Sequence, residues 1–114
     1  MKKAYVLNSC STCQRILKEI KWEGEIQNIK EKNIDKKTLQ ALAKEHGSYE
    51  ALFSKRAMKY RSLGLNEQEL SEYDYRDWIL KEYTFLKRPV FLIDDKTFVG
   101  NSKKVVEQIK AHLS

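Results

Sequence analysis

The sequence predicts a mixed α/β protein whose elements follow the order β-α-β, helical insert, β-β-α. Short apolar runs typical of strands lie near both ends of the chain. Apolar residues at helical spacing follow them, and a long middle segment shows helical patterns without a strand. A chain of 114 residues with 41% hydrophobic residues has the size and composition of one compact domain. We therefore expect a single domain over residues 1–114, with the helical insert at about 35–83.

The first half begins with a strand over residues 4–7, which are apolar and favour β structure. Asn8 and Ser9 supply turn and capping chemistry before a helix over residues 13–22. The apolar side chains of that helix recur at helical spacing: Ile16, Leu17 and Ile20. A turn then leads into a second strand over residues 25–29, where polar and apolar residues alternate.

The insert begins with a helix that Asp35 caps and that runs to about His46, with Gly47 in the stop position. Its buried stripe is expected at Leu39, Leu42 and Ala43. Residues 49–83 are helical and charged, with no evident strand. Core packing is the expected role of two aromatic side chains in this segment, Tyr75 and Trp78.

The second half of the sheet follows the insert. Residues 89–93 have the strongest strand pattern of the chain, residues 94–96 form a hairpin turn, and residues 97–99 return as the partner strand. Asn101 or Ser102 caps a C-terminal helix whose inward side chains are Val105, Val106, Ile109 and Leu113.

Both cysteines of the chain, Cys10 and Cys13, lie where the first strand gives way to a helix. A thiol at a helix start meets unpaired backbone N–H groups and the positive end of the helix dipole, which favour the thiolate. Arg15 and nearby lysines add positive charge. Cys13 lies about one turn further on and can attack a bond formed at Cys10. The pair therefore predicts a redox-active centre, with Cys10 as nucleophile and Cys13 as resolving thiol.

Other interpretations of the cysteines are weaker. Buried apolar cysteines are common, but two in one loop favour chemistry. Zinc as a rule needs four ligands, and the other candidates, His46 and His112, stand alone on predicted helices, so we expect no metal. A phosphatase-like anion loop needs five residues between cysteine and arginine, whereas four separate Cys10 from Arg15.

The formal net charge of +6 favours anionic partners. The cationic segment 55–61 is more simply a solvated helix face than a nucleic-acid site, and we expect no direct nucleic-acid binding. No apolar stretch suggests a membrane span or a signal peptide. We expect a cytoplasmic protein, where thiols are kept reduced.

Two motifs together resemble the arsenate reductase-like (ArsC) family, which includes arsenate reductases, Spx regulators and YffB-like proteins. They are NSCSTCQR at 8–15, between a strand and a helix, and LKRPV at 86–90, before the hairpin. The resemblance covers nearly the whole chain. It implies a thioredoxin-like fold with a mixed four-stranded sheet, and a cis bond between Arg88 and Pro89 that places the proline opposite the reactive thiol.

The resemblance also assigns residues to the site. Cys10 matches the reactive cysteine, Arg56 matches an arginine in the insert of Spx-like and YffB-like members, and Arg88 matches the arginine before the cis proline. Both guanidiniums suit bidentate binding of an oxyanion. The stretch FVGNS at 98–102 lacks the third arginine of arsenate reductases. Gln14 replaces a usual basic residue, with Arg15 beside it as a partial substitute.

Two functions follow from the resemblance. The first is a thiol-disulfide oxidoreductase that reduces arsenate or a glutathione-linked substrate through Cys10. It would have no tightly bound cofactor, and glutathione, glutaredoxin or thioredoxin would be the reductant. Whether Cys13 or glutathione resolves the intermediate is open. The alternative is an Spx-like redox-sensing transcriptional regulator that binds RNA polymerase and uses a Cys10–Cys13 disulfide as its switch. We expect a monomer in either case.

Overall fold

The computed structural model describes all 114 residues, which group into two compact units. The first unit comprises residues 1–32 and 88–114, and the second comprises residues 33–87. The second unit corresponds closely to the insert expected at 35–83. The expectation of a single domain stays a prediction.

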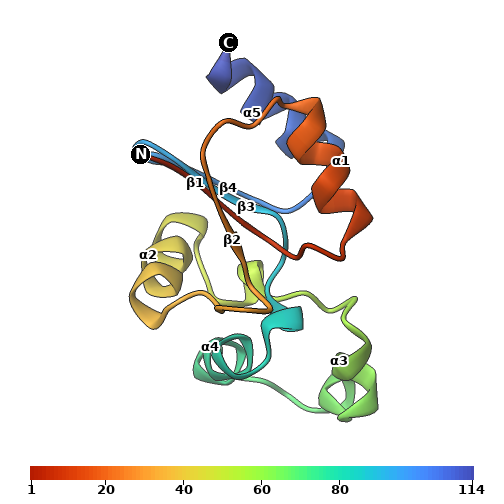
Figure 1. Cartoon of the computed structure of the whole chain (residues 1–114). Helices are drawn as coiled ribbons and strands as arrows, with labels where there is room; N and C mark the ends of the chain where they lie inside the picture. The colour runs from red at the N-terminus through yellow and green to blue at the C-terminus, as the bar shows by residue number, and fades with distance from the viewer. The chain divides into compact units, whose positions relative to one another are not determined.

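The first unit is built on a four-stranded mixed sheet of order β2-β1-β3-β4 (Figure 1). Strand β1 pairs in parallel with β2 and antiparallel with β3, and β3 pairs antiparallel with β4. The four strands are β1 (Lys2–Val6), β2 (Glu25–Asn28), β3 (Val90–Ile93) and β4 (Lys96–Val99). The α/β fold class and the mixed sheet are therefore confirmed.

Helices α1 (Ser11–Glu19) and α5 (Lys103–Leu113) lie side by side on one face of this sheet (Figure 1). Their apolar stripes make one core with the inward residues of β1 and β3. That core contains Ala4, Val6, Cys13, Ile16, Ile20, Phe91, Ile93, Val106 and Ile109. An ion pair of 2.9 Å between Lys110 Nζ and Glu19 Oε2 joins the two helices at the surface.

The second unit contains three α-helices and three single 3-10 turns. The helices are α2 (Lys36–His46), α3 (Met58–Ser62) and α4 (Glu72–Lys81), and the turns are η1 (Glu50–Leu52), η2 (Leu65–Glu67) and η3 (Tyr83–Phe85). At the start of α2 the Asp35 carboxylate accepts a hydrogen bond from the Thr38 backbone N–H at 2.7 Å, and Gly47 ends this helix in the left-handed region at φ 101°.

An aromatic cluster lies in the core of the second unit, beside buried aliphatic residues such as Leu39 and Leu52. The fully buried Phe53 ring contacts three others, with centroid distances of 4.8 Å to Phe85, 5.0 Å to Tyr75 and 5.7 Å to Tyr60. The packing role expected for Tyr75 and Trp78 agrees with this, because Trp78 packs edge-on against Phe85 at 5.8 Å.

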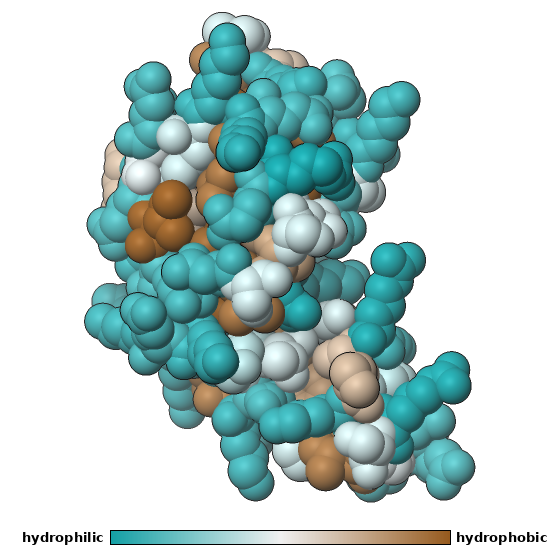
Figure 2. Space-filling model, turned by 45° about the vertical axis from the view of Figure 1, so that its right-hand side comes forward, coloured by the Kyte–Doolittle hydropathy of each residue, from teal (hydrophilic) through white to brown (hydrophobic).

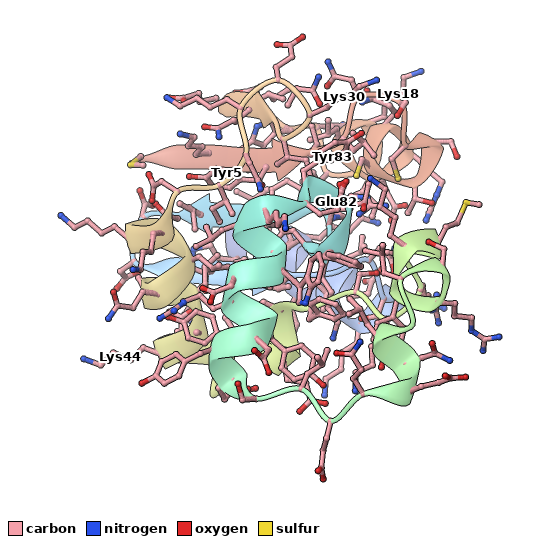
Figure 3. All side chains as sticks on the ribbon, turned by 90° about the horizontal axis from the view of Figure 1, so that it is seen from below. Tyr5, Lys18, Lys30, Lys44, Glu82 and Tyr83 are labelled. Atoms are coloured by element: carbon pink, nitrogen blue, oxygen red, sulfur yellow. The ribbon has the colours of Figure 1, made fainter.

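The end of α4 is tied to α3 by an ion pair at the surface of the second unit. Glu82, labelled with Tyr83 in Figure 3, follows the last residue of α4 and lies 2.7 Å from Lys59 Nζ through its Oε1 atom.

The structure differs from the predicted elements in several places. Strand β1 covers Lys2–Val6 rather than residues 4–7, and Lys96 begins β4 rather than ending the turn, because it pairs with Ile93. Helix α1 begins at Ser11 rather than residue 13, because Cys10 is the N-cap, and it ends at Glu19 before Lys21 takes a positive φ of 53°. An isolated antiparallel bridge joins Phe53 to Leu86 in a segment expected to have no strand. Strand β3 begins at Val90, so Pro89 precedes it.

The large hydrophobic side chains at the surface are few: Met1, Ile26, Met58, Leu63 and Tyr73. The face in Figure 2 is mostly hydrophilic, and its hydrophobic atoms occur in small separate areas. None of the helices has both the length and the apolar character that crossing a membrane requires.

Candidate active site at the start of helix α1

The candidate site begins in the loop between β1 and α1, residues 7–10. Strand β1 is an inner strand of the sheet, so it delivers the chain to α1 from a fixed position. The backbone N–H of Cys10 donates to the Leu7 carbonyl at 2.9 Å, which closes a tight turn. Cys10 then serves as the N-cap of α1 with extended dihedral angles, φ −86° and ψ 111°. Its part-exposed thiol lies beside the backbone N–H groups of Thr12 and Cys13.

The pKa of the Cys10 thiol lies below its ordinary value of 9.0. Burial is the largest single influence and opposes ionisation. The backbone N–H of Cys13, the Cys13 thiol, the backbone N–H of Thr12 and the positive charge of Arg88 together outweigh it. The Cys10 side chain makes no full capping hydrogen bond. The N–H groups therefore act on the sulfur as nearby dipoles.

Cys13 has the opposite properties. Its side chain is fully buried in the core under α1. Burial raises the pKa of this thiol to about 11. The backbone of Leu7 and the charge of Arg88 oppose the rise, whereas the hydrogen bond to Cys10 and the charge there add to it. The two sulfurs thus form a pair in which the Cys13 thiol donates a hydrogen bond to the Cys10 sulfur, and the negative charge is favoured on Cys10.

The segment before β3 supplies a positive charge that acts on both thiols. Arg88 is half-buried, and its charge lowers the pKa of both thiols. The Arg88–Pro89 peptide bond is cis, which confirms the prediction for this bond. Pro89 is buried, and its carbonyl accepts a hydrogen bond of 2.9 Å from the Gly100 N–H. That Pro89 faces the thiol stays a prediction.

The other predicted arginines have different surroundings. Arg15 is exposed on α1, and its Nη1 atom lies 3.6 Å from Glu19 Oε1, one turn further along the helix. Arg56 is exposed and belongs to the second unit, so its role in the site stays a prediction. The nearby Lys18 points outward from α1 (Figure 3). Of these cations, Arg88 is the one whose charge lowers the pKa of both thiols.

Two residues that the sequence did not assign to the site hold its loop. Asn28 Oδ1 accepts hydrogen bonds from the backbone N–H groups of Asn8 at 3.2 Å and Lys30 at 3.4 Å. The Gln14 side chain donates to the Asn8 carbonyl at 3.3 Å. The sequence singled out Gln14 only because it replaces a basic residue that is usual in the resembled family. Asn28 could have been assigned to the loop from its position at the end of a strand that pairs with β1.

No group of three or more His, Cys, Asp or Glu side chains is arranged to hold a metal ion. His46 is the last residue of α2, and His112 lies in the last turn of α5. The chemistry that the loop can support is that of its sulfur atoms. A thiolate at a helix start can attack an electrophilic centre, and a second thiol lies within hydrogen-bonding distance of it.

The sheet, its two covering helices and the cysteine loop define a protein of the thioredoxin-like class. The model of the ArsC family matches residues 5–109, and the chain belongs to that family. None of the curated proteins compared with the chain matches it.

Solved structures with the same fold cover nearly the whole chain. A protein titled YFFB is 23% identical, with a TM-score of 0.84 over 100% of both chains. A possible arsenate reductase from Streptococcus mutans UA159 is 22% identical, with a TM-score of 0.77 over 96% of this chain and 97% of that one. The arsenate reductase from Vibrio cholerae is 16% identical, with a TM-score of 0.76 over 95% and 93%. At these identities the likeness supports the fold.

Proposed function

We propose that the protein is a thiol-disulfide oxidoreductase in which Cys10 is the nucleophile and arsenate or a glutathione-linked compound is the substrate. The observation that carries this proposal is the lowered pKa of Cys10, a part-exposed thiol at a helix start beside Arg88. Thiolate rather than thiol is the attacking species, so the lowered pKa increases the reactive fraction at neutral pH.

In the arsenate version of the reaction, the Cys10 thiolate attacks arsenic and one arsenate oxygen leaves as water after protonation. A second thiol then attacks the adduct. Its sulfur forms a disulfide with Cys10, and the arsenic takes two electrons and leaves as arsenite. In sum, dihydrogen arsenate, two thiols and one proton give arsenous acid, one disulfide and one water. External glutathione with glutaredoxin, or thioredoxin, reduces the disulfide.

Arg88 and Arg56 are the proposed oxyanion ligands, because a guanidinium matches two oxygens at once. The stretch FVGNS at 98–102 offers no third arginine. A glutathione-linked substrate, which presents carboxylates, is therefore retained beside arsenate.

The test is arsenate-dependent consumption of NADPH with glutathione, glutaredoxin and glutathione reductase present. We expect turnover by the natural protein and none by Cys10→Ser, with both proteins showing the same thermal unfolding midpoint. Full turnover by Cys10→Ser would disprove the assignment of the nucleophile. The assay is repeated with a glutathione mixed disulfide to separate the two substrate classes.

The resolving thiol is tested by Cys13→Ser in the same assay. With a pKa of about 11, roughly one Cys13 thiol in ten thousand is ionised at pH 7. This favours an external thiol as the resolving group. We therefore expect Cys13→Ser to retain most of the turnover, whereas a resolving Cys13 would make it inactive after one cycle.

The hydrogen bond between the two thiols supports a second candidate, an Spx-like redox sensor that binds RNA polymerase. In that case oxidation by peroxide removes two electrons and closes a Cys10–Cys13 disulfide, and the loop change alters the affinity for the polymerase. No arsenate-dependent turnover, together with a disulfide that forms readily by mass spectrometry and a redox-dependent affinity for RNA polymerase, would favour the sensor.

A further inference from the structure

The loop that carries Cys10 has little support of its own. Residues 7–10 connect β1 to α1, and Asn8 and Ser9 are exposed. Within the loop, the backbone hydrogen bond runs from the Cys10 N–H to the Leu7 carbonyl. The position of the sulfur thus depends on what holds the exposed part of the turn.

Side chains from two different elements bind the backbone of Asn8 from its two sides. Its N–H donates to Asn28 Oδ1 at 3.2 Å, and its carbonyl accepts from Gln14 Nε2 at 3.3 Å. Both backbone polar groups of one exposed loop residue are therefore paired by amide side chains.

Asn28 is suited to this position by the sheet. It is the last residue of β2 and the register partner of Val6, the last residue of β1. Because the two strands are parallel, both end at the same edge of the sheet, where the thiol loop begins. The second bond of Asn28 Oδ1, from the Lys30 N–H at 3.4 Å, fixes the direction of its amide.

Gln14 connects the same loop to the helix. Its backbone N–H donates to the Cys10 carbonyl at 3.2 Å, so its own position is set by the residue that carries the sulfur. Its side chain then returns from the first turn of α1 to Asn8. The loop, the strand end and the first turn of the helix are thereby joined around Cys10.

We propose that Gln14 and Asn28 are positioning residues that hold Asn8 and so keep the Cys10 sulfur beside the backbone N–H groups of Thr12 and Cys13. This inference rests on the proposed role of Cys10 as nucleophile. Neither amide is proposed to touch the substrate. Their effect would be on the fraction of Cys10 that is ionised.

The experiment measures the rate of Cys10 alkylation by iodoacetamide as a function of pH, with mass spectrometry to identify the modified cysteine. The variants are Gln14→Met and Asn28→Leu, which keep the side-chain size and remove the amide. Gln27→Met is the matched control, because the Gln27 amide also donates to a backbone carbonyl, that of Lys32 at 2.7 Å, away from Asn8.

We expect each variant to raise the midpoint of the pH profile by about half a unit to one unit. This is roughly a three- to tenfold loss of thiolate at pH values below the midpoint. The plateau rate at high pH should remain, because the thiolate itself is unchanged. Gln27→Met should leave the midpoint in place. A general loss of structure would instead change the plateau and the unfolding midpoint together.

Two results would overturn the inference. If the natural protein shows a lowered midpoint that neither variant moves, or that Gln27→Met moves equally, the amides do not position the thiol while the proposed function stands. If the natural protein alkylates like an ordinary thiol, the proposed nucleophile and its positioning residues fail together.

Discussion

The two units of the molecule reach order by different means. In the first unit, regular strands pair residues far apart in the sequence, such as Lys2 with Ile93, and the Cys10 thiol follows the end of an inner strand. The second unit has no sheet, and rings from its helices and turns pack around one buried phenylalanine. A sheet thus fixes the position of a chemical group through pairing between distant strands, whereas buried aromatic rings can hold helices and turns together without one.

The largest expected effect is on the aromatic core. Phe53→Ala should lower the free energy of unfolding by about 3–5 kcal/mol, because it removes a fully buried ring and leaves a cavity among its neighbours. Tyr73, which is 65% exposed, is the control, and Tyr73→Ala should change the stability by less than about 0.5 kcal/mol. Equal losses in urea titrations would contradict the central role of Phe53.

The two tryptophans allow the units to be followed separately in the same titrations, since Trp22 belongs to the first unit and Trp78 to the second. Single-tryptophan variants, Trp22→Phe and Trp78→Phe, report each unit by fluorescence. The expectation of a single domain predicts coincident transitions. Separate transitions, with only the second lowered by Phe53→Ala, would show two domains instead.

The next largest expected effect is a loss of stability from filling a close contact at Gly24 in the first unit. A Cβ atom at Gly24 would lie 2.6 Å from Trp22 Cζ2 and 2.7 Å from both the Cβ and the carbonyl oxygen of Lys2. Gly24→Ala should therefore cost about 1–3 kcal/mol through overpacking against backbone. Gly47→Ala in the second unit meets nothing within 4 Å and should cost only about 1 kcal/mol, from its positive φ. Chemical unfolding of both variants measures the difference.

The pH dependence of the free energy of unfolding should reveal the titration of the buried Cys13 thiol. Cys13 has a folded-state pKa raised from 9.0 to about 11, so its contribution is fully present below pH 9 and is lost as the pH rises toward 11. The loss over this window is on the order of 1–3 kcal/mol. Cys13→Ser lacks this titration, so its stability should fall less between pH 9 and 11. Parallel curves for the two proteins would contradict the assignment.

The smallest effects concern helix caps, one in each unit. The Ser71 hydroxyl and the Asp74 carboxylate form a reciprocal capping box at the start of α4, whereas Ser102 caps α5 through one bond from the Val105 N–H. Each serine-to-alanine change should cost about 0.5–2 kcal/mol. We expect the larger value for Ser71→Ala, because the box satisfies two backbone donors. A greater loss in Ser102→Ala would reverse this order.

The regular elements of the fold were predictable from local patterns. The periodic apolar residues Ile16 and Ile20 indicated α1, and Asp35 with Gly47 correctly bounded α2. The 3-10 turns were not predictable, because a turn of three residues contains less than one period of any pattern. The bridge between Phe53 and Leu86 joins residues far apart in the sequence, and no local signal indicates such a pair.

The site was predictable to the extent that chemistry depends on residue type and spacing. The separation of Cys10 and Cys13 predicted their place in the candidate site, which stays a prediction, and the resemblance predicted the cis bond before Pro89, which is confirmed. The surface ion pair of Arg15 with Glu19 depends on a side-chain rotamer, which spacing leaves open. Asn28 was not predicted, because an amide at the end of a strand gives no sign in the sequence of the backbone group that it binds.

The inner position of β1 has a consequence for synthesis on the ribosome. Its first neighbour, β2, is made soon after it, but its other neighbour, β3, follows only after the whole second unit. Until then one edge of β1 has unpaired N–H and carbonyl groups, which can template association with other chains. The open edge of β1 in the newly made chain is therefore protected from other chains only after residues 90–93 have been made and have paired with it.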